Sequence, residues 1–222
     1  MTGFRLACVL FDLDGTLVDT APDLIASLNK ALVEHGFNGV EYDAVKPYIS
    51  YGANAMIKTS TDTDEPTQAA ILDSMLANYQ NNIAQHSLFF QGIPEVLDHL
   101  EQQGLKWGVV TNKRKRFTEP LMTALNLAQR ASCIISGDST QYSKPHPEPM
   151  LAACAQAGVA SENCLYIGDA SHDIAAGKSA NMKTLAALYG YLKPDDRPET
   201  WGADAMIRSP LEITGWLKQW AC

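Results

Sequence analysis

The sequence lacks the features of a membrane or secreted protein: it has no apolar run long enough to span a bilayer, and its N-terminus has no basic-then-apolar signal pattern. Positive charge is also scarce, since 17 lysines and arginines stand against 25 aspartates and glutamates and the net charge is −8. An acidic chain is an unfavourable partner for nucleic acid or an anionic membrane. We therefore expect a cytoplasmic protein that binds neither nucleic acid nor a membrane. The composition leaves its oligomeric state, monomer or homodimer, open.

Cysteine is scarce as well, with five residues, an odd number, and no C-x-x-C pair. Cys8, Cys133 and Cys164 lie in apolar strand-like runs and are expected to be small core residues. Cys154 falls on a predicted helix, and Cys222 at the end of the chain is expected to be exposed. This pattern argues against a zinc site and against a cysteine nucleophile.

The most informative stretch is Leu6 to Thr20, LACVLFDLDGTLVDT. Its apolar run predicts a buried strand that stops at Asp12 and Asp14. Residues i and i+2 of an extended segment point the same way, so both carboxylates can face one spot beyond the end of the strand. Two such carboxylates repel each other unless a cation or a shared proton lies between them. An aspartate-rich turn is the structural alternative.

Residues 18–84 carry helical patterns and no convincing strand. The first predicted helix begins with Thr20 as N-cap, Pro22 in the first turn and Asp23 at the capping-box position. Further helices are predicted over 43–49, over 53–60 and from Pro66 onward. We therefore predict that 18–84 is an all-helical insert.

From Leu88 onward, predicted helices and strands alternate, which indicates a parallel sheet with helices on both faces. The predicted strands are 107–110, 133–135, 164–167, 184–187 and 205–207, and the predicted helices are 94–103, 117–126, 147–157, 173–180 and 211–220. The strand before Asp12 belongs to the same sheet. The predicted fold class is thus α/β, with a Rossmann-like parallel core domain formed by residues 1–17 and 85–222 and interrupted by the helical domain 18–84.

Polar side chains follow two more of these strands, and a lysine precedes one of them. Thr111 follows the strand 107–110, and Asp169 and Asp173 follow 164–167. Lys144 lies ahead of the latter strand in the proline-rich turn SKPHPEP. Because ligands of open α/β sheets bind at the carboxyl ends of the strands, we expect these groups to meet Asp12 and Asp14 there. A hydroxyl, an ammonium and four carboxylates suit phosphoryl transfer with a hard divalent cation.

Each of these residues also has a structural alternative. Thr111, Asp169 and Asp173 could cap the helices that follow them. Lys144 could be a solvated surface lysine, although flanking prolines hold its backbone. The occurrence of all four at the expected ends of alternating strands favours a functional site.

Four segments in order resemble the four motifs of the haloacid dehalogenase-like superfamily of phosphatases: DLDGTLVDT, VVTNK, SKPHPEP and GDASHDIAAG. The helical insert resembles the mobile cap of the phosphoglycolate phosphatase-like branch. The resemblance covers essentially the whole chain. Departures are minor, since Arg114 and Gln91 stand where many relatives have proline.

The resemblance implies a mechanism with two aspartates. Asp12 corresponds to a nucleophile that forms an aspartyl-phosphate. Asp14 corresponds to the general acid for the leaving alkoxide and then to the general base for the attacking water. For the first role Asp14 must be protonated near neutral pH, so its surroundings are expected to raise its pKa.

The resemblance also implies a cofactor and a phosphate site. Mg²⁺ is expected on the carboxylate of Asp12, the backbone carbonyl of Asp14 and Asp169, with Asp173 acting through a bound water. The phosphoryl oxygens are expected to bind Thr111 and backbone N–H groups, with Lys144 offsetting their charge. The residues expected to supply these N–H groups are Leu13, Asp14 and Asn112.

Two groups within the superfamily are most similar: the phosphoglycolate phosphatases and the N-acetylmuramic acid 6-phosphate phosphatases. The stretches WGVVTNKRKRFTEP and YGYLKPDDRPETWGAD resemble the second group more. Arg116 and the turn Tyr48 to Gly52, with Ser50 and Tyr51, are expected to contact the leaving group from the side of the phosphate away from the metal. The expected function is Mg²⁺-dependent hydrolysis of a small phosphomonoester.

Other classes share parts of this pattern. A two-component receiver domain has about half this length and no helical insert, and a haloalkanoate dehalogenase needs neither an acid at Asp14 nor magnesium. A phosphosugar mutase of the same superfamily, which keeps both aspartates, and a non-catalytic module that binds phosphorylated ligands stay open. We expect the cap to close over the site during the reaction, with hinges near Leu17 to Asp19 and His86 to Gln91.

Overall fold

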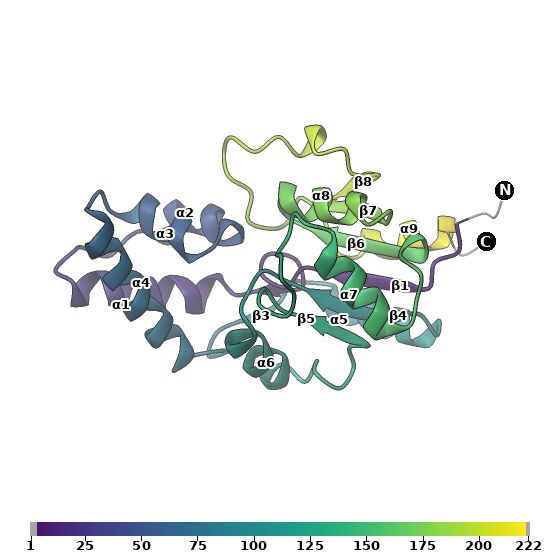
Figure 1. Cartoon of the computed structure of the whole chain (residues 1–222), viewed down its shortest axis with the longest axis horizontal. Helices are drawn as coiled ribbons and strands as arrows, with labels where there is room; N and C mark the ends of the chain where they lie inside the picture. Colours follow the sequence, from purple (N-terminus) through teal and green to yellow (C-terminus); the bar gives the residue numbers. More distant parts are fainter. Residues whose placement is uncertain (1–3, 221–222) are drawn as a thin grey trace.

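A six-stranded parallel sheet lies at the centre of the computed structural model, with the strand order β5-β4-β1-β6-β7-β8 (Figure 1). Its strands are β1 (Cys8–Phe11), β4 (Lys106–Val110), β5 (Cys133–Ile135), β6 (Cys164–Gly168), β7 (Lys183–Ala187) and β8 (Ala205–Ile207). The structure describes residues 4–220, so the expectation for Cys222 lies outside the described residues. The α/β class predicted from the alternation of helices and strands is confirmed.

Helices cover both faces of this sheet, because alternate residues of each strand point in opposite directions (Figure 1). Val9 and Phe11 point into one hydrophobic core, and Cys8 and Leu10 point into the other. The first core is completed by helices α5 (Ile93–Gln102), α6 (Lys115–Ala124) and α9 (Glu212–Trp220). The second is completed by helices α7 (Glu148–Ala157) and α8 (Ser171–Ser179). Within residues 4–220, no helix has the length and apolar character of a membrane span.

The described cysteines are buried free thiols: Cys8, Cys133, Cys154 and Cys164. The core positions expected for Cys8, Cys133 and Cys164 are confirmed, and Cys154 lies on a helix as predicted, in α7. Burial raises the pKa of the Cys133 thiol to about 12. A thiol with so high a pKa is not ionised at neutral pH and is therefore a poor nucleophile. The expectation that the chemistry does not use cysteine agrees with this environment.

A helical unit follows β1, and the chain crosses to it and back at two neighbouring points (Figure 1). It contains α1 (Ala21–Glu34), α2 (Tyr42–Val45), the 3₁₀ helix η1 (Lys46–Tyr51), α3 (Ala53–Ser60) and α4 (Glu65–Gln80). Helices α1 and α4 pack through their own hydrophobic core, which includes Leu28, Leu32, Ile71 and Met75. Phe117 of α6 and Tyr191 also belong to this core, and Ile83 and Phe90 pack against both it and the first core of the sheet.

The expectation that no strand lies between residues 18 and 84 is wrong at one point. Strand β2 (Val18–Asp19) pairs antiparallel with β3 (Leu88–Phe89) where the chain crosses between the sheet and the helical unit. A strand of two residues has no periodicity that a sequence pattern could reveal. Whether these crossings act as hinges stays a prediction.

Two residues at the start of α1 do not cap it in the expected way. Thr20 occupies the N-cap position, but its hydroxyl donates to Asp14 Oδ1 at 2.5 Å and caps no helical N–H. Asp23 accepts hydrogen bonds from the backbone N–H of His86 at 2.9 Å and from the hydroxyl of Ser87 at 2.6 Å. Both side chains therefore connect α1 to neighbouring segments, because these tertiary partners compete with the local capping bonds.

Candidate active site

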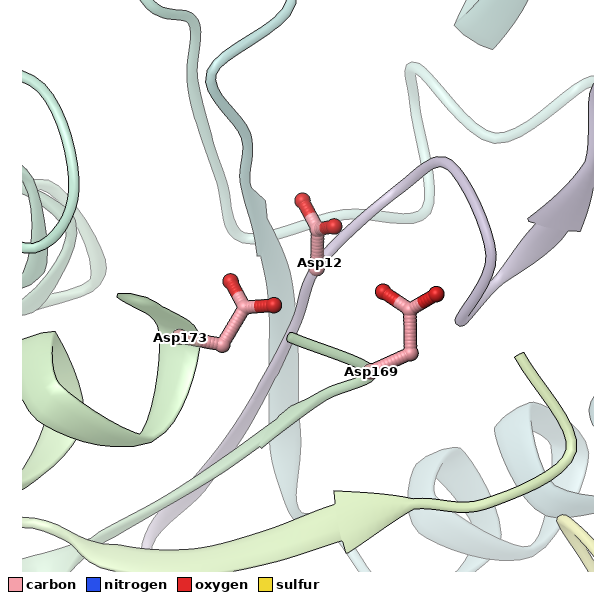
Figure 2. A group of neighbouring side chains, drawn as sticks. All are labelled: Asp12, Asp169 and Asp173. Carbon is pink, nitrogen blue, oxygen red and sulfur yellow. The ribbon is translucent and has the colours of Figure 1, made fainter. Parts of the chain in front are cut away.

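The predicted site residues meet at the carboxyl edge of the sheet. Asp12 directly follows β1, Thr111 directly follows β4 and Asp169 directly follows β6, while Asp173 lies in the first turn of α8. All four are buried. Figure 2 shows the carboxylates of Asp12, Asp169 and Asp173 around a shared space, and one oxygen of each lies within 4.8 Å of the others. Parallel strand order thus brings together side chains up to 161 positions apart, from Asp12 to Asp173.

Lys144 is the cation that contacts this cluster. Its Nζ donates to Asp12 Oδ1 and to Asp173 Oδ1, both at 2.7 Å, and to the Tyr166 hydroxyl at 2.9 Å. The side chain is 1% exposed, so the alternative of a solvated surface lysine is wrong. The Asn112 side chain accepts the Lys144 N–H at 3.0 Å and donates to the Lys144 carbonyl at 3.1 Å. Asn112 therefore fixes the backbone that carries the lysine.

The pKa values of the cluster reflect burial first and the neighbouring charges second. Burial raises the pKa of Asp12 to about 7, with Lys144 opposing the rise and Asp173 adding to it. Burial and the neighbouring carboxylates Asp12 and Asp173 raise the pKa of Asp169 well above its usual range. Although burial also acts on Asp173, Lys144 holds its pKa below the usual value. One lysine therefore leaves part of the repulsion uncompensated.

The donor set of the cluster fits a hard divalent cation. Asp169 Oδ2 accepts the Tyr191 N–H at 2.7 Å and the Ser50 hydroxyl at 2.8 Å. Asp169 Oδ1 is buried and has no hydrogen-bond partner among residues 4–220. A buried carboxylate oxygen without a partner is unfavourable. Carboxylate oxygens are the ligands that Mg²⁺ and Ca²⁺ prefer, so a cation between these carboxylates removes both the orphaned acceptor and the repulsion.

Asp14 has partners of its own beside the cluster. Its Oδ1 accepts hydrogen bonds from the Thr20 hydroxyl at 2.5 Å and from Lys113 Nζ at 3.0 Å. The Lys113 ammonium also lies 4.5 Å from the ring centroid of Tyr79 in α4. Although burial opposes it, Asp14 and Tyr79 raise the pKa of Lys113. Lys113 was missed as a site residue, and its place directly after Asn112 in VVTNK was the available signal.

A cavity of about 710 Å³ lies between this edge of the sheet and the helical unit. The carboxylate residues Asp12 and Asp14 line it together with Thr111, Asn112 and Lys144. Its other walls include Ser50, Tyr51, Gly52, Met56, Leu72, Leu76, Arg116, Phe117 and His172. The expected leaving-group contacts Ser50, Tyr51, Gly52 and Arg116 therefore all face this cavity, while the phosphate-binding role of the Leu13 backbone stays a prediction.

The turn Tyr48 to Gly52 contacts the carboxylate cluster. The Ser50 hydroxyl donates to Asp169, a member of this cluster. Ser50 therefore closes the cavity next to the candidate metal centre. Its contact with Asp169 joins residues 119 positions apart, and nothing in the local sequence signals it. That the turn contacts the leaving group on the side of the phosphate away from the metal stays a prediction.

The fold and the site define an α/β enzyme with a candidate metal centre at the carboxyl edge of its sheet. The family model described as haloacid dehalogenase-like hydrolase matches residues 9–187, and the chain belongs to this family. The family predicted from the four motifs is confirmed.

Relatives that match almost the whole chain are named phosphatases. The N-acetylmuramic acid 6-phosphate phosphatase of Pseudomonas putida is 43% identical, over 94% of this chain and 95% of the relative. The phosphoglycolate phosphatase of Xanthomonas campestris pv. campestris is 37% identical, over 92% of this chain and 93% of the relative. The crystal structure of a predicted phosphoglycolate phosphatase from Haemophilus somnus 129PT has a TM-score of 0.85 at 28% identity and covers 98% of this chain and 99% of its own. The predicted enzyme class is thereby confirmed.

Proposed function

We propose that this chain is a Mg²⁺-dependent phosphomonoester hydrolase that forms an aspartyl-phosphate on Asp12. The observation that carries the proposal is the position of Asp12, which lies on the cavity wall within the carboxylate cluster and 2.7 Å from Lys144 Nζ. A carboxylate at a cavity surface is accessible to a phosphorus atom, and the adjacent ammonium offsets the charge that accumulates there.

In the first step Asp12 attacks the phosphorus atom, the bond between phosphorus and the leaving oxygen breaks, and Asp14 gives its proton to that oxygen. Asp14 lines the same cavity two residues from Asp12, and Thr20 and Lys113 fix the position of its side chain. Thr111 Oγ1 accepts the backbone N–H of Lys113 at 3.1 Å, which leaves its O–H to donate to a phosphoryl oxygen.

In the second step a water molecule attacks the phosphorus of the aspartyl-phosphate. Asp14, now ionised, takes the proton of this water, the bond between phosphorus and Asp12 breaks, and inorganic phosphate leaves. The two steps restore both aspartates to their starting states. We further propose that the helical unit 18–84 acts as a cap that excludes bulk water from these steps.

The carboxylates of Asp12, Asp169 and Asp173 would hold the cation, together with the backbone carbonyl of Asp14. Bound Mg²⁺ supplies positive charge that offsets the phosphoryl oxygens. Removal of divalent cations with EDTA is expected to abolish turnover, and added Mg²⁺ is expected to restore it. Undiminished phosphate release after exhaustive EDTA treatment contradicts the metal site.

The cavity supports a substrate larger than phosphoglycolate. Its volume of about 710 Å³ lies within the range of sites that enclose drug-sized ligands, and a two-carbon acid leaves most of it unfilled. Part of the wall is apolar, with Met56, Leu72 and Leu76, and Arg116 on the same wall suits a carboxylate. We therefore favour N-acetylmuramic acid 6-phosphate, which the relative at 43% identity is named for, over phosphoglycolate as the second candidate.

The test is a side-by-side measurement of kcat/KM for N-acetylmuramic acid 6-phosphate and phosphoglycolate. The proposal expects phosphate release from both or from the first alone, with the first favoured. A preference for phosphoglycolate overturns the substrate assignment but not the reaction. Conversion of a hexose 1-phosphate to another phosphosugar without phosphate release indicates a mutase, and no release from any phosphomonoester indicates a binding module.

A further inference from the structure

The segment between β7 and β8 leaves the sheet and passes beside the helical unit, where it appears in yellow-green (Figure 1). It meets the helical unit at Tyr51, whose hydroxyl donates to Asp196 Oδ1 at 2.6 Å. Lys193 Nζ lies 4.3 Å from the centroid of the Tyr51 ring and 3.9 Å from Asp196 Oδ1. A carboxylate and an ammonium thus hold one tyrosine that lies 145 positions from the carboxylate in the chain.

Asp196, which accepts the Tyr51 O–H, is held in place by the segment between β7 and β8. Asp196 Oδ2 accepts the backbone N–H of Lys193 at 2.8 Å, so the carboxylate is fixed whether or not Tyr51 is present. The Asp196 side chain is 9% exposed, whereas that of the neighbouring Asp195 is 79% exposed. Burial and Asp196 raise the pKa of Tyr51 above its usual value, so its hydroxyl stays a donor at neutral pH.

Tyr51 carries this contact to the substrate cavity. It lines the cavity and meets His172, another lining residue, edge-on at 6.3 Å between ring centroids. The preceding residue, Ser50, donates to Asp169 in the carboxylate cluster. Asp196 itself is not among the lining residues in the part of the chain that the structure describes. It therefore reaches the cavity through Tyr51.

We propose that Asp196 is a positioning residue that fixes Tyr51 and thereby sets how tightly the site binds the leaving group of its substrate. The inference rests on the proposed function, because it assigns the wall at Ser50 and Tyr51 to substrate binding. Asp196 belongs to the stretch YGYLKPDDRPETWGAD. The role that we propose for it requires no contact with the substrate.

Two variants weaken the contact from opposite sides. Tyr51→Phe removes the hydroxyl and leaves the Asp196 bond to the Lys193 N–H in place. Asp196→Asn keeps one side-chain oxygen that can accept this N–H, but the group that then faces Tyr51 is an amide NH2, which cannot accept the tyrosine O–H, and the negative charge is lost. Asp195→Asn is the matched control, because it removes a neighbouring carboxylate that also faces Lys193, at 3.5 Å, without touching Tyr51.

With N-acetylmuramic acid 6-phosphate as substrate, Asp196→Asn and Tyr51→Phe are each expected to raise KM about tenfold, as for the loss of a hydrogen bond to a charged group, with kcat unchanged. The double variant is expected to be no worse than Tyr51→Phe, because both changes act on one contact. Asp195→Asn is expected to match the wild type. An unchanged KM in Asp196→Asn, or full additivity in the double variant, overturns the inference.

Hydrogen exchange measured on the free protein supplies a second readout that needs no turnover. Amides of residues 46–52 are expected to exchange faster in Asp196→Asn and in Tyr51→Phe than in Asp195→Asn, since the turn loses its support. Equal exchange in all three variants overturns the inference. If no phosphomonoester is hydrolysed, the proposed function fails, while the exchange experiment still decides whether Asp196 positions Tyr51.

Discussion

Aspartates at the two edges of the central sheet lie in different electrostatic environments, although Lys144, against the effect of burial, lowers the pKa of Asp173 at the carboxyl edge. At the carboxyl edge, burial raises the pKa of Asp12 to about 7, and burial with like charges raises that of Asp169. At the amino edge, Asp204 precedes β8 and lies 2.6 Å from the ammonium of Lys183, the first residue of β7. Although partial burial opposes it, hydrogen bonds from Lys183 and Thr184 lower the pKa of Asp204.

The difference separates residues that stabilise the fold from residues that are held ready for chemistry. At the amino edge, Asp204 is paired with Lys183, and both side chains are partly exposed to water. The carboxyl edge gathers buried carboxylates around Lys144 and leaves one oxygen of Asp169 without a partner among residues 4–220. Perturbed ionisation of this kind is characteristic of functional sites, because a fold selected for stability alone gains nothing from it.

The largest expected effect is at the carboxyl edge. Asp12→Asn removes the nucleophile but keeps the shape of the side chain, so kcat is expected to fall on the order of 10⁴-fold or more. Thermal unfolding of the variant is expected to stay close to that of the wild type, since the substitution also relieves repulsion with Asp173. Steady-state kinetics and a melting curve on the same preparation check both parts. Near-wild-type turnover means that Asp12 is not the nucleophile.

A second substitution compares the two edges directly. Lys144→Met leaves the carboxylate cluster without its buried cation and is expected to destabilise the metal-free protein by about 3–5 kcal/mol. Lys183→Met breaks a pair whose lysine is 41% exposed, and its cost is expected to be about 1 kcal/mol or less. Denaturant unfolding with and without Mg²⁺ measures both. Mg²⁺ is expected to restore part of the stability of Lys144→Met and none of that of Lys183→Met; equal losses in the two variants break the comparison.

The packing behind the cluster gives a third test. A methyl group on Gly190 overlaps Asp169 and the carbonyl oxygen of Gly15, so Gly190→Ala is expected to cost about 1–3 kcal/mol and to weaken Mg²⁺ binding. Gly215→Ala in α9 is the control, because a methyl group there meets nothing within 4 Å. That change is expected to stabilise the protein slightly, as alanine does in a helix. Calorimetric Mg²⁺ titration that is the same for Gly190→Ala and the wild type contradicts the role given to Asp169.

The smallest expected effect is at the amino edge and depends on pH. Because the pKa of Asp204 is lower in the folded protein, its contribution to stability is present above the ordinary value of 3.8. That contribution is lost as the pH falls through the lowered pKa. Asp204→Asn is therefore expected to be less stable than the wild type at neutral pH by about 1 kcal/mol. If the stabilities of Asp204→Asn and the wild type do not converge in acid, the pKa of Asp204 does not contribute to stability in this way. Reduced turnover of Asp204→Asn contradicts the view that the amino edge serves stability alone.

Three groups of the carboxyl edge could be placed from the sequence because each is adjacent to a strand end. Asp12, Thr111 and Asp169 directly follow β1, β4 and β6, so identifying the strands was enough to place them. Because the strands of the sheet run parallel, their carboxyl ends lie at one edge, so these three residues could be expected to meet there. Lys144 needed the proline-rich turn as an additional signal.

The wall of the cavity could not be predicted in the same way. The contacts of Ser50 with Asp169 and of Tyr51 with Asp196 join segments 119 and 145 residues apart, and no periodicity marks them. Thr20 could not be assigned from local sequence either. Its pattern predicted a helix cap, whereas its hydroxyl donates to Asp14. Local rules describe what a segment prefers alone, and tertiary partners decide among the bonds that it can make.

Trapping the covalent intermediate tests the central claim most directly. The Asp14→Asn variant keeps the nucleophile but lacks the base for hydrolysis, and 4-nitrophenyl phosphate has a leaving group that needs little protonation. Acid quenching of this reaction followed by peptide mass spectrometry is expected to find a hydroxylamine-labile phosphoryl group on Asp12, absent from an Asp12→Asn, Asp14→Asn double variant. Release of 4-nitrophenol with no phosphoryl group on Asp12 at any quench time contradicts the account.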